Sequence, residues 1–155
     1  MSGEANGVPE VSREHLLAIY RQSRAEFPKE CCGYILGSGA QAELVACENR
    51  QDKLHAIDPE ANPRTAENGY NIGGKELLRL VRSFDGDRPA TIIYHSHPRV
   101  GAYFSREDTD AALAAGYPVD YLVVDVQEDG VREAKLFRRD GERYVEVARF
   151  GGAEV

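Results

Sequence analysis

Residues 94–110 read YHSHPRVGAYFSREDTD, and this stretch decides how the rest of the chain is interpreted. Two histidines, His95 and His97, are separated by a single residue and are followed at once by Pro98. Alternate residues of a β-strand project from the same face, so we expect the two imidazoles to lie side by side. Proline has no N–H to donate to a sheet, so it ends the ladder there. The stretch therefore predicts a strand that ends in a pair of histidines.

The second half of the stretch, SREDTD, predicts the start of a helix. Ser105 is a typical N-cap residue, and Asp108 follows three residues later as in a capping box. Two histidines on an arbitrary strand are more often surface or core residues than ligands, and the capping box alone explains the helix start. A histidine pair at a strand end, followed by an acid in the first turn of the next helix, nevertheless points to a metal site. If Asp108 binds a metal and Ser105 a substrate, the capping box need not form in full.

His95, His97 and Asp108 are three good zinc ligands, and three protein ligands leave the fourth tetrahedral position open for water. This arrangement is typical of a catalytic zinc, because a structural zinc is normally closed by four ligands. Such a site also needs an oxyanion donor and a general base. Ser105 is placed to be the donor. Several carboxylates remain open as the base: Glu30, Asp58, Glu60, Glu67, Glu107 and Asp110.

The composition limits the classes of function. A chain of 155 residues fits one domain, and its net charge of −7 argues against affinity for nucleic acid or anionic membranes. No apolar run approaches the roughly 20 residues that span a bilayer. The first residues lack the basic and apolar regions of a secretory signal, so we expect a cytoplasmic protein. Its three cysteines, Cys31, Cys32 and Cys47, are expected to stay reduced, and they form no CxxC zinc knuckle.

Periodicity predicts one domain over residues 12–150, with flexible ends at 1–11 and 151–155. Helices are predicted between Ser12 and Pro28, over 75–84 and over 106–116. Strands are predicted over 31–37, 42–48, 89–97, 120–126, 131–138 and 143–149. Residues 49–74 are expected to form a long functional loop with a strand fragment around 56–58. The fold class is therefore α/β (α+β), a mixed sheet of about six strands flanked by three helices.

The stretch HSHPRVGAYFSRED resembles the motif of the JAMM metalloprotease family, also called JAB or MPN+. That motif is His-Ser/Thr-His, seven residues, then Ser-x-x-Asp. Bacterial members often carry an upstream glutamate in a second motif, Pro-x-Glu-x-Cys-Gly with an apolar segment that ends in Leu-Gly, and this chain has it as PKECCGYILG at 28–37. The order of elements is also similar over about residues 12–149. Two separated motifs make the match specific, and it implies a small stand-alone bacterial member with the cytidine-deaminase-like MPN/JAB architecture.

The resemblance implies roles for individual residues. His95, His97 and Asp108 look like the ligands of one Zn²⁺ per chain. Glu30 looks like the general base, which takes a proton from the zinc-bound water and returns it to the leaving amine. Ser105 looks like the residue that stabilises the oxyanion.

Other positions carry weaker implications. Ser96 matches the middle Ser/Thr position, whose role is less defined. Many bacterial members have proline before the motif serine, whereas this chain has Phe104. No ligand or base changes, so we still expect activity, with Phe104 packed against the core or the substrate channel. Further substrate contacts are expected in the 49–74 segment, where His55 and Tyr70 are candidates.

The resemblance implies a deubiquitinase-like zinc peptidase or isopeptidase. It would hydrolyse the amide bond after the C-terminal Gly-Gly of a ubiquitin-like or sulfur-carrier protein. Glycine suits a narrow cleft because it has no Cβ, and such a tail can add a strand to a sheet edge. Three alternatives stay open. The first is a catalytically silent MPN scaffold, although this chain keeps all five motif positions. The second is a RadC-like DNA-associated protein, although the motif of that group typically reads His-Asn-His-Pro-Ser-Gly. The third is a zinc amidase that acts on a small molecule.

Overall fold

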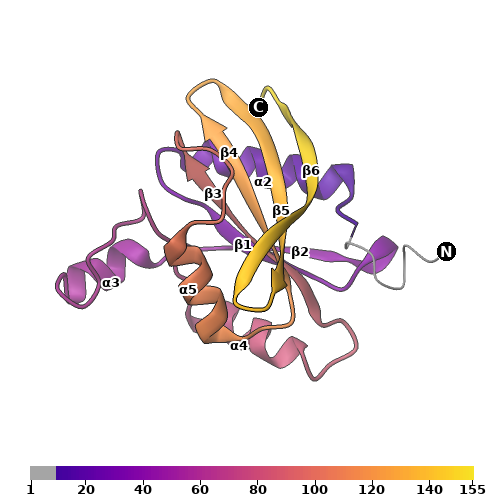
Figure 1. The fold of residues 1–155 in the computed structure, drawn as a ribbon, viewed down its shortest axis with the longest axis horizontal. Helices are drawn as coiled ribbons and strands as arrows, with labels where there is room; N and C mark the ends of the chain where they lie inside the picture. Colours follow the sequence, from indigo (N-terminus) through magenta and orange to yellow (C-terminus); the bar gives the residue numbers. More distant parts are fainter. Residues whose placement is uncertain (1–9) are drawn as a thin grey trace.

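The computed structural model describes residues 10–155, so most of the predicted flexible N-terminus lies outside the described residues. Six strands form one sheet in the order β2-β1-β3-β4-β5-β6 (Figure 1). β3 and β4 are parallel, and the other neighbours are antiparallel. The strands are β1 (Cys32–Leu36), β2 (Glu43–Cys47), β3 (Ala90–Pro98), β4 (Asp120–Gln127), β5 (Gly130–Asp140) and β6 (Arg143–Ala153). The predicted mixed sheet of six strands is confirmed.

Four α-helices accompany the sheet in the described part of the chain. They are α2 (Arg13–Glu26), α3 (Gln51–Ile57), α4 (Gly74–Ser83) and α5 (Arg106–Ala115), with a short 3-10 helix, η1 (Gly39–Gln41), before β2. Ser12 caps α2 as predicted, because its side chain accepts a hydrogen bond from the His15 N–H at 3.1 Å. α5 ends at Gly116, whose left-handed φ of 66° suits glycine. The three predicted helices are confirmed, and α3 is an addition.

The strand fragment predicted around 56–58 is wrong, because residues 51–57 form α3. This helix projects away from the sheet in Figure 1, and none of its residues is buried. Ile57 is 80% exposed, so α3 has no buried apolar face that would mark its helical period in the sequence. Local polar contacts hold it instead: the Asn49 side chain accepts a hydrogen bond from the Gln51 N–H at 3.0 Å. The helix is therefore invisible to periodicity.

The last strand is longer than predicted. β6 continues past residue 149 to Ala153, which pairs with Val131, so part of the expected 151–155 tail belongs to the sheet. From the sequence, the two glycines near this end suggest that the strand stops before them. Gly152, however, lies where an added Cβ would clash with the carbonyl oxygen of Val131. Close pairing with β5 therefore requires glycine at this position.

The two faces of the sheet are covered by different helices. α2 packs on one face, where its buried residues Leu16, Ile19 and Tyr20 belong to a core cluster. The sheet contributes to this cluster Ile35, Ile92, Tyr94, Leu122, Val124, Val126, Val131, Ala134 and Leu136. α4 and α5 pack on the other face through Leu80 and Ala112. The sheet residues of that second cluster are Cys32, Tyr34, Leu36, Cys47, Ala90, Ile93 and Tyr121.

Gly33 explains why the second motif contains a glycine. It pairs with Tyr94 across β1 and β3, and an added Cβ would clash with the Tyr94 hydroxyl and the Val45 carbonyl. That hydroxyl donates a hydrogen bond to the Gln22 side chain of α2 at 2.5 Å. Only glycine lets β1 lie this close to β3. This close pairing brings Glu30, two residues before β1, toward the end of β3.

The cysteines are buried free thiols, as expected. Cys31 belongs to the α2-side cluster and Cys32 to the opposite one, so the two neighbours point to opposite faces. Burial raises the pKa of Cys31 to about 12, which keeps its thiol protonated and poorly reactive. These thiols are core residues.

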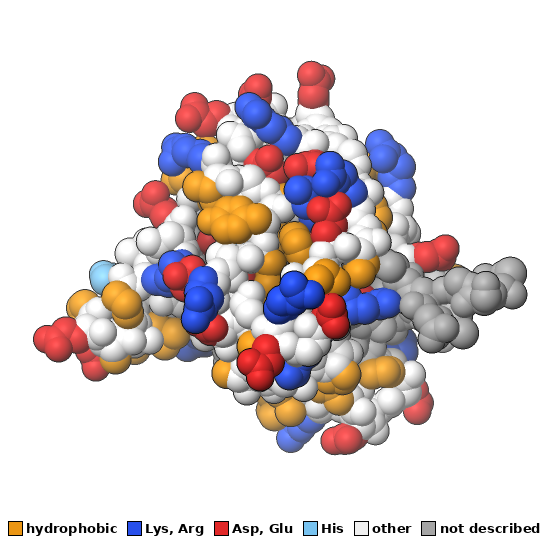
Figure 2. All heavy atoms as spheres, viewed as in Figure 1, with side chains coloured by type: hydrophobic (Ala, Val, Ile, Leu, Met, Phe, Trp, Pro, Cys, Tyr) orange, Lys and Arg blue, Asp and Glu red, His pale blue; other side chains and the backbone are white. Residues whose placement is uncertain are grey.

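No helix within residues 10–155 has the length and apolar character needed to cross a membrane. On the face presented in Figure 2, acidic and basic side chains are interspersed.

Candidate metal centre and active site

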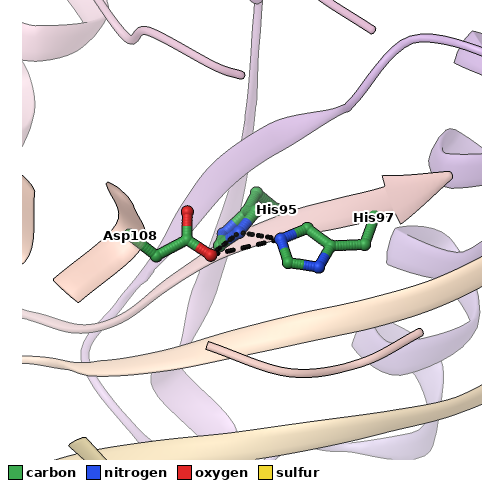
Figure 3. A group of neighbouring side chains, drawn as sticks. All are labelled: His95, His97 and Asp108. Atoms are coloured by element: carbon green, nitrogen blue, oxygen red, sulfur yellow. Dashed lines mark hydrogen bonds and ion pairs between the residues drawn. The ribbon is translucent and has the colours of Figure 1, made fainter. Parts of the chain in front are cut away.

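Three side chains from two elements converge at the end of β3 (Figure 3). The Nε2 atoms of His95 and His97 lie 3.2 Å apart, and each lies 3.1 Å from Oδ2 of Asp108 in the first turn of α5. In a tetrahedral zinc site with bonds of about 2.0–2.1 Å, neighbouring ligand atoms are about 3.3 Å apart. The observed separations therefore fit the edges of a zinc coordination tetrahedron.

The protonation of His97 supports the same conclusion. Its Nδ1 lies 3.0 Å from the carbonyl oxygen of Gly101, which can only accept, so Nδ1 carries the proton. In the neutral ring, Nε2 is then an unprotonated acceptor that faces Asp108 Oδ2, a second acceptor. Two acceptors at this distance repel unless a proton or a metal cation lies between them. A histidine fixed by a backbone carbonyl is also the usual form of a metal ligand.

Burial makes the electrostatics of this group strong. His95 is fully buried, and the Asp108 side chain is only 11% exposed. Burial by itself would raise the pKa of Asp108, but the neighbouring imidazoles of His95 and His97 hold that pKa below its ordinary value. Burial would lower the pKa of His95, but the Asp108 carboxylate outweighs this and raises it. The carboxylate therefore stays ionised, as a metal ligand must.

Glu30 approaches this group from the start of β1. β1 pairs with β3 so that Cys32 lies opposite His95, which places Glu30 near the end of the histidine strand. Glu30 is 5% exposed, and burial raises the pKa of its carboxyl, an effect that the neighbouring His95 and His97 oppose. Glu30 is outside the ligand group formed by the described residues. The other carboxylates left open by the sequence are all solvent exposed: Asp58, Glu60, Glu67, Glu107 and Asp110.

Ser96, the middle residue of the first motif, forms hydrogen bonds that join β3 to the residue just before β1. Its hydroxyl accepts a hydrogen bond from the Cys31 N–H at 2.8 Å, and its own N–H donates to the Cys31 carbonyl at 3.1 Å. Cys31 directly follows Glu30, and Ser96 lies between the two histidines. The pair of hydrogen bonds thus keeps the carboxylate in register with the imidazoles.

The residues SRED form a complete capping box. The Ser105 hydroxyl accepts from the Asp108 N–H at 3.0 Å, and Asp108 Oδ2 accepts from the Ser105 N–H at 3.1 Å. The sequence did not require the box to form in full beside a metal, but it does, because the same carboxylate oxygen faces both the Ser105 N–H and the histidines. The hydroxyl proton of Ser105 takes no part in these bonds and remains available to a substrate.

Asn49 was missed by the sequence analysis. Its side-chain nitrogen donates to the carbonyl oxygens of Glu30 at 2.9 Å and Gly69 at 3.0 Å. Its side-chain oxygen accepts from the N–H groups of Gln51 at 3.0 Å and Asn71 at 3.1 Å. One amide thus joins the backbone of Glu30 to the 49–74 segment. Nothing distinguishes this asparagine in a polar stretch except its place directly after a predicted strand.

The candidate substrate contacts lie in three different environments. The ring of Tyr70 stacks on His95, with centroids 4.5 Å apart and planes inclined by 20°. His55 lies on α3, where its Nδ1 is 2.8 Å from the carbonyl oxygen of Asn62. Phe104 packs against three aromatic rings, Tyr121, Phe137 and Tyr144. Tyr70 alone of these three candidates touches the ligand group.

A cavity of about 370 Å³ adjoins Asp108. It lies between α4, α5 and residues 69–72, and its walls are mainly apolar. Its polar lining residues include Gln51, Arg64, Asn71 and Glu107. An apolar cavity with a few polar groups, next to a candidate metal centre, is the expected place for a ligand.

Residues 12–138 match the family model described as prokaryotic homologs of the JAB domain. Because this match covers most of the chain, the protein belongs to that family, and the recognition drawn from the two motifs is confirmed.

The chain is 27% identical over 122 residues to the CysO-cysteine peptidases of Mycobacterium bovis and Mycobacterium tuberculosis. Each match covers 78% of this chain and 75% of the relative. Among solved structures, the solution structure of a Desulfitobacterium hafniense protein is similar with a TM-score of 0.60 at 19% identity. That of a Salinibacter ruber protein is similar with a TM-score of 0.54 at 17% identity. Both structural matches cover 87% of this chain and 86% of the other, and they show a shared fold.

Proposed function

We propose that this protein is a zinc-dependent peptidase that hydrolyses the amide bond after the C-terminal Gly-Gly of a ubiquitin-like or sulfur-carrier protein. The observation that carries the proposal is the convergence of His95, His97 and Asp108, with Glu30 buried beside them, in a member of the JAB family. The name of the mycobacterial relatives, CysO-cysteine peptidase, supports a carrier-protein substrate.

In this proposal His95, His97 and Asp108 would hold one zinc ion, which would supply Lewis-acid activation of the scissile carbonyl and of water. Glu30 takes a proton from the attacking water and passes it to the departing nitrogen, a task suited to a buried carboxyl with a raised pKa. Ser105 donates its hydroxyl proton to the developing oxyanion. The net reaction adds one water across the amide and yields the carboxylate of the carrier and a free amine.

The test is to incubate the zinc-loaded protein with ubiquitin-like and sulfur-carrier proteins extended beyond Gly-Gly, and to identify the products by mass. We expect cleavage directly after the second glycine, its loss on chelation, and its return when zinc is added. Full activity of the chelated protein would exclude a metal mechanism. Failure to cleave any extended carrier would overturn the substrate class.

A paired substitution on α5 tests the metal site directly. Asp108→Ala removes one of three ligands, so we expect the purified variant to lose stoichiometric zinc in elemental analysis. Asp110→Ala is the matched control, because Asp110 lies on the same helix but is exposed and, among the described residues, pairs only with Arg106. Equal zinc content in the two variants would contradict the assigned ligand set.

A further inference from the structure

The cavity beside Asp108 is lined by one positively charged side chain that has no role in the proposed reaction. Among the described residues that line this cavity, Arg64 is the only lysine or arginine. It belongs to the 49–74 segment and reaches across to α5, where its Nη2 lies 3.2 Å from Oε1 of Glu107. Glu107 directly precedes the proposed ligand Asp108. A guanidinium is therefore held close to the proposed reaction centre, in a cavity that is otherwise mainly apolar.

The contacts of Arg64 fix its backbone but leave its charged end able to change partner. The Gln51 side chain donates to the Arg64 carbonyl at 3.0 Å, and one guanidinium nitrogen donates to the Asn68 carbonyl. The pair with Glu107 is open to solvent, since the two side chains are 40% and 55% exposed. Exposed ion pairs contribute little stability, so a ligand carboxylate can replace Glu107 at small cost. Arginine can bind such a carboxylate through two parallel hydrogen bonds.

The chemistry of the leaving group determines whether a cation is useful here. When a single amino acid leaves a carrier protein, its α-carboxylate lies two bonds from the departing nitrogen. When a protein leaves through a lysine side chain, no carboxylate of that residue is free. The net charge of −7 opposes an anionic group, so an anionic leaving group needs a local cation.

We propose that Arg64 binds the α-carboxylate of a single amino acid joined to the C-terminus of the carrier protein. Arg64 is then a specificity-determining residue that favours adducts of carrier and amino acid over conjugates between two proteins. This inference rests on the proposed function and names its leaving group.

The experiment compares three substrates that differ only beyond Gly-Gly: a carrier ending in one amino acid, the same adduct with a terminal carboxamide, and an isopeptide conjugate to a protein lysine. We expect kcat/KM for the free carboxylate to exceed that for the carboxamide by about 10- to 100-fold, as for one or two charge-assisted hydrogen bonds. Arg64→Ala should abolish this preference by slowing only the carboxylate adduct. It should leave the carboxamide and the isopeptide conjugate unchanged. Arg64→Lys keeps the charge without the planar fork and should retain part of the preference.

Two control variants separate a binding role from a structural one. Glu107→Gln breaks the same ion pair from the other side but keeps the guanidinium, so the carboxylate preference should persist. Arg106→Ala removes a neighbouring exposed arginine that pairs with Asp110, and it should also change nothing. An equal loss of preference in Arg64→Ala and Glu107→Gln would show that Arg64 acts only as a strut between the 49–74 segment and α5, and would overturn the inference.

The failure of the inference differs from the failure of the proposed function. If wild-type protein cleaves the carboxylate and carboxamide adducts equally well, Arg64 has no role in selection while the peptidase function stands. If wild-type protein cleaves none of the three substrates, the proposed function itself fails and the inference fails with it.

Discussion

The two faces of the sheet are built from the same strands but differ in what they bury. On the α2 face, the described core cluster is made mainly of aliphatic and aromatic side chains. On the α4/α5 face, buried residues include His95 and His97, and a cavity remains beside Asp108. β3 contributes side chains to both faces, because alternate residues of a strand point to opposite sides of the sheet. Ile92 and Tyr94 pack toward α2, whereas Ile93 lies on the side of the site.

This difference shows how one small domain combines stability with a polar site. Buried polar groups and empty volume both cost free energy unless they are hydrogen-bonded or filled. On the α4/α5 face this cost is concentrated at His95, whose Nδ1 is buried without a hydrogen-bond partner among the described residues. The α2 face has no comparable feature among its clustered residues and offsets the cost through apolar packing. The comparison predicts that substitutions on the two faces change different properties.

The largest expected effect is on the site face and is confined to activity. Glu30→Gln keeps the shape of the side chain but removes the proposed base, so kcat/KM should fall by about 10²- to 10⁴-fold. Zinc content and the thermal midpoint should stay close to wild type, because Glu30 lies outside the ligand group. Glu60→Gln, at an exposed position, is the control. Loss of zinc from Glu30→Gln would mean that the carboxylate is a ligand and not the base.

The next effect compares neighbouring residues on opposite faces of β3. Ile92→Ala should lower the free energy of unfolding by about 2–5 kcal/mol, because the side chain is fully buried in the α2-side core. Ile93→Ala should cost less, because Ile93 already borders the cavity and loses fewer contacts. Urea denaturation measures both values. Equal costs would contradict the distinction between a closed face and a face with free volume.

A smaller effect is expected at the amide that joins the two parts of the site. Asn49→Ala removes two donors and one acceptor that serves two N–H groups, so the free energy of unfolding should fall by about 1–3 kcal/mol. Because Glu30 loses a backbone anchor, kcat should fall by about 10-fold while zinc is retained, at the lower end of what loss of positioning costs. Asn68→Ala, an exposed asparagine of the same segment, is the control. Unchanged kcat in Asn49→Ala would show that the carboxylate is positioned by Ser96 alone.

The parts of the site that were predicted from the sequence depend on local geometry. His95 and His97 are two residues apart on a strand, and Ser105 and Asp108 belong to one helix start, so their relation follows from backbone periodicity. Glu30 is different. Its carboxylate was one of six candidates for the general base, and only the family resemblance singled it out. In the structure Glu30 is buried and the other five carboxylates are exposed, and the assignment of Glu30 as the base stays a prediction.

The features that were missed depend on contacts between distant residues or on helices without a buried face. α3 has no apolar period to detect, and Gly152 is explained only by the carbonyl oxygens of β5. The hydrogen bond from Asn49 to Glu30 joins residues 19 positions apart. The pair of Arg64 and Glu107 joins the 49–74 segment to α5. No local sequence pattern indicates such pairs, because they form only when separate elements pack together.

From the sequence alone followed the strand-and-helix framework, the proposed ligand set of His95, His97 and Asp108 and, through resemblance, the family. Those properties follow from hydrophobic periodicity and from motif spacing, which act over a few residues. The tertiary structure alone decided that Glu30 is buried beside the histidines, that Tyr70 stacks on His95, and that a cavity with Arg64 adjoins Asp108. Burial and proximity depend on how distant segments pack, and packing sets the desolvation and charge interactions on which the chemistry of the site depends.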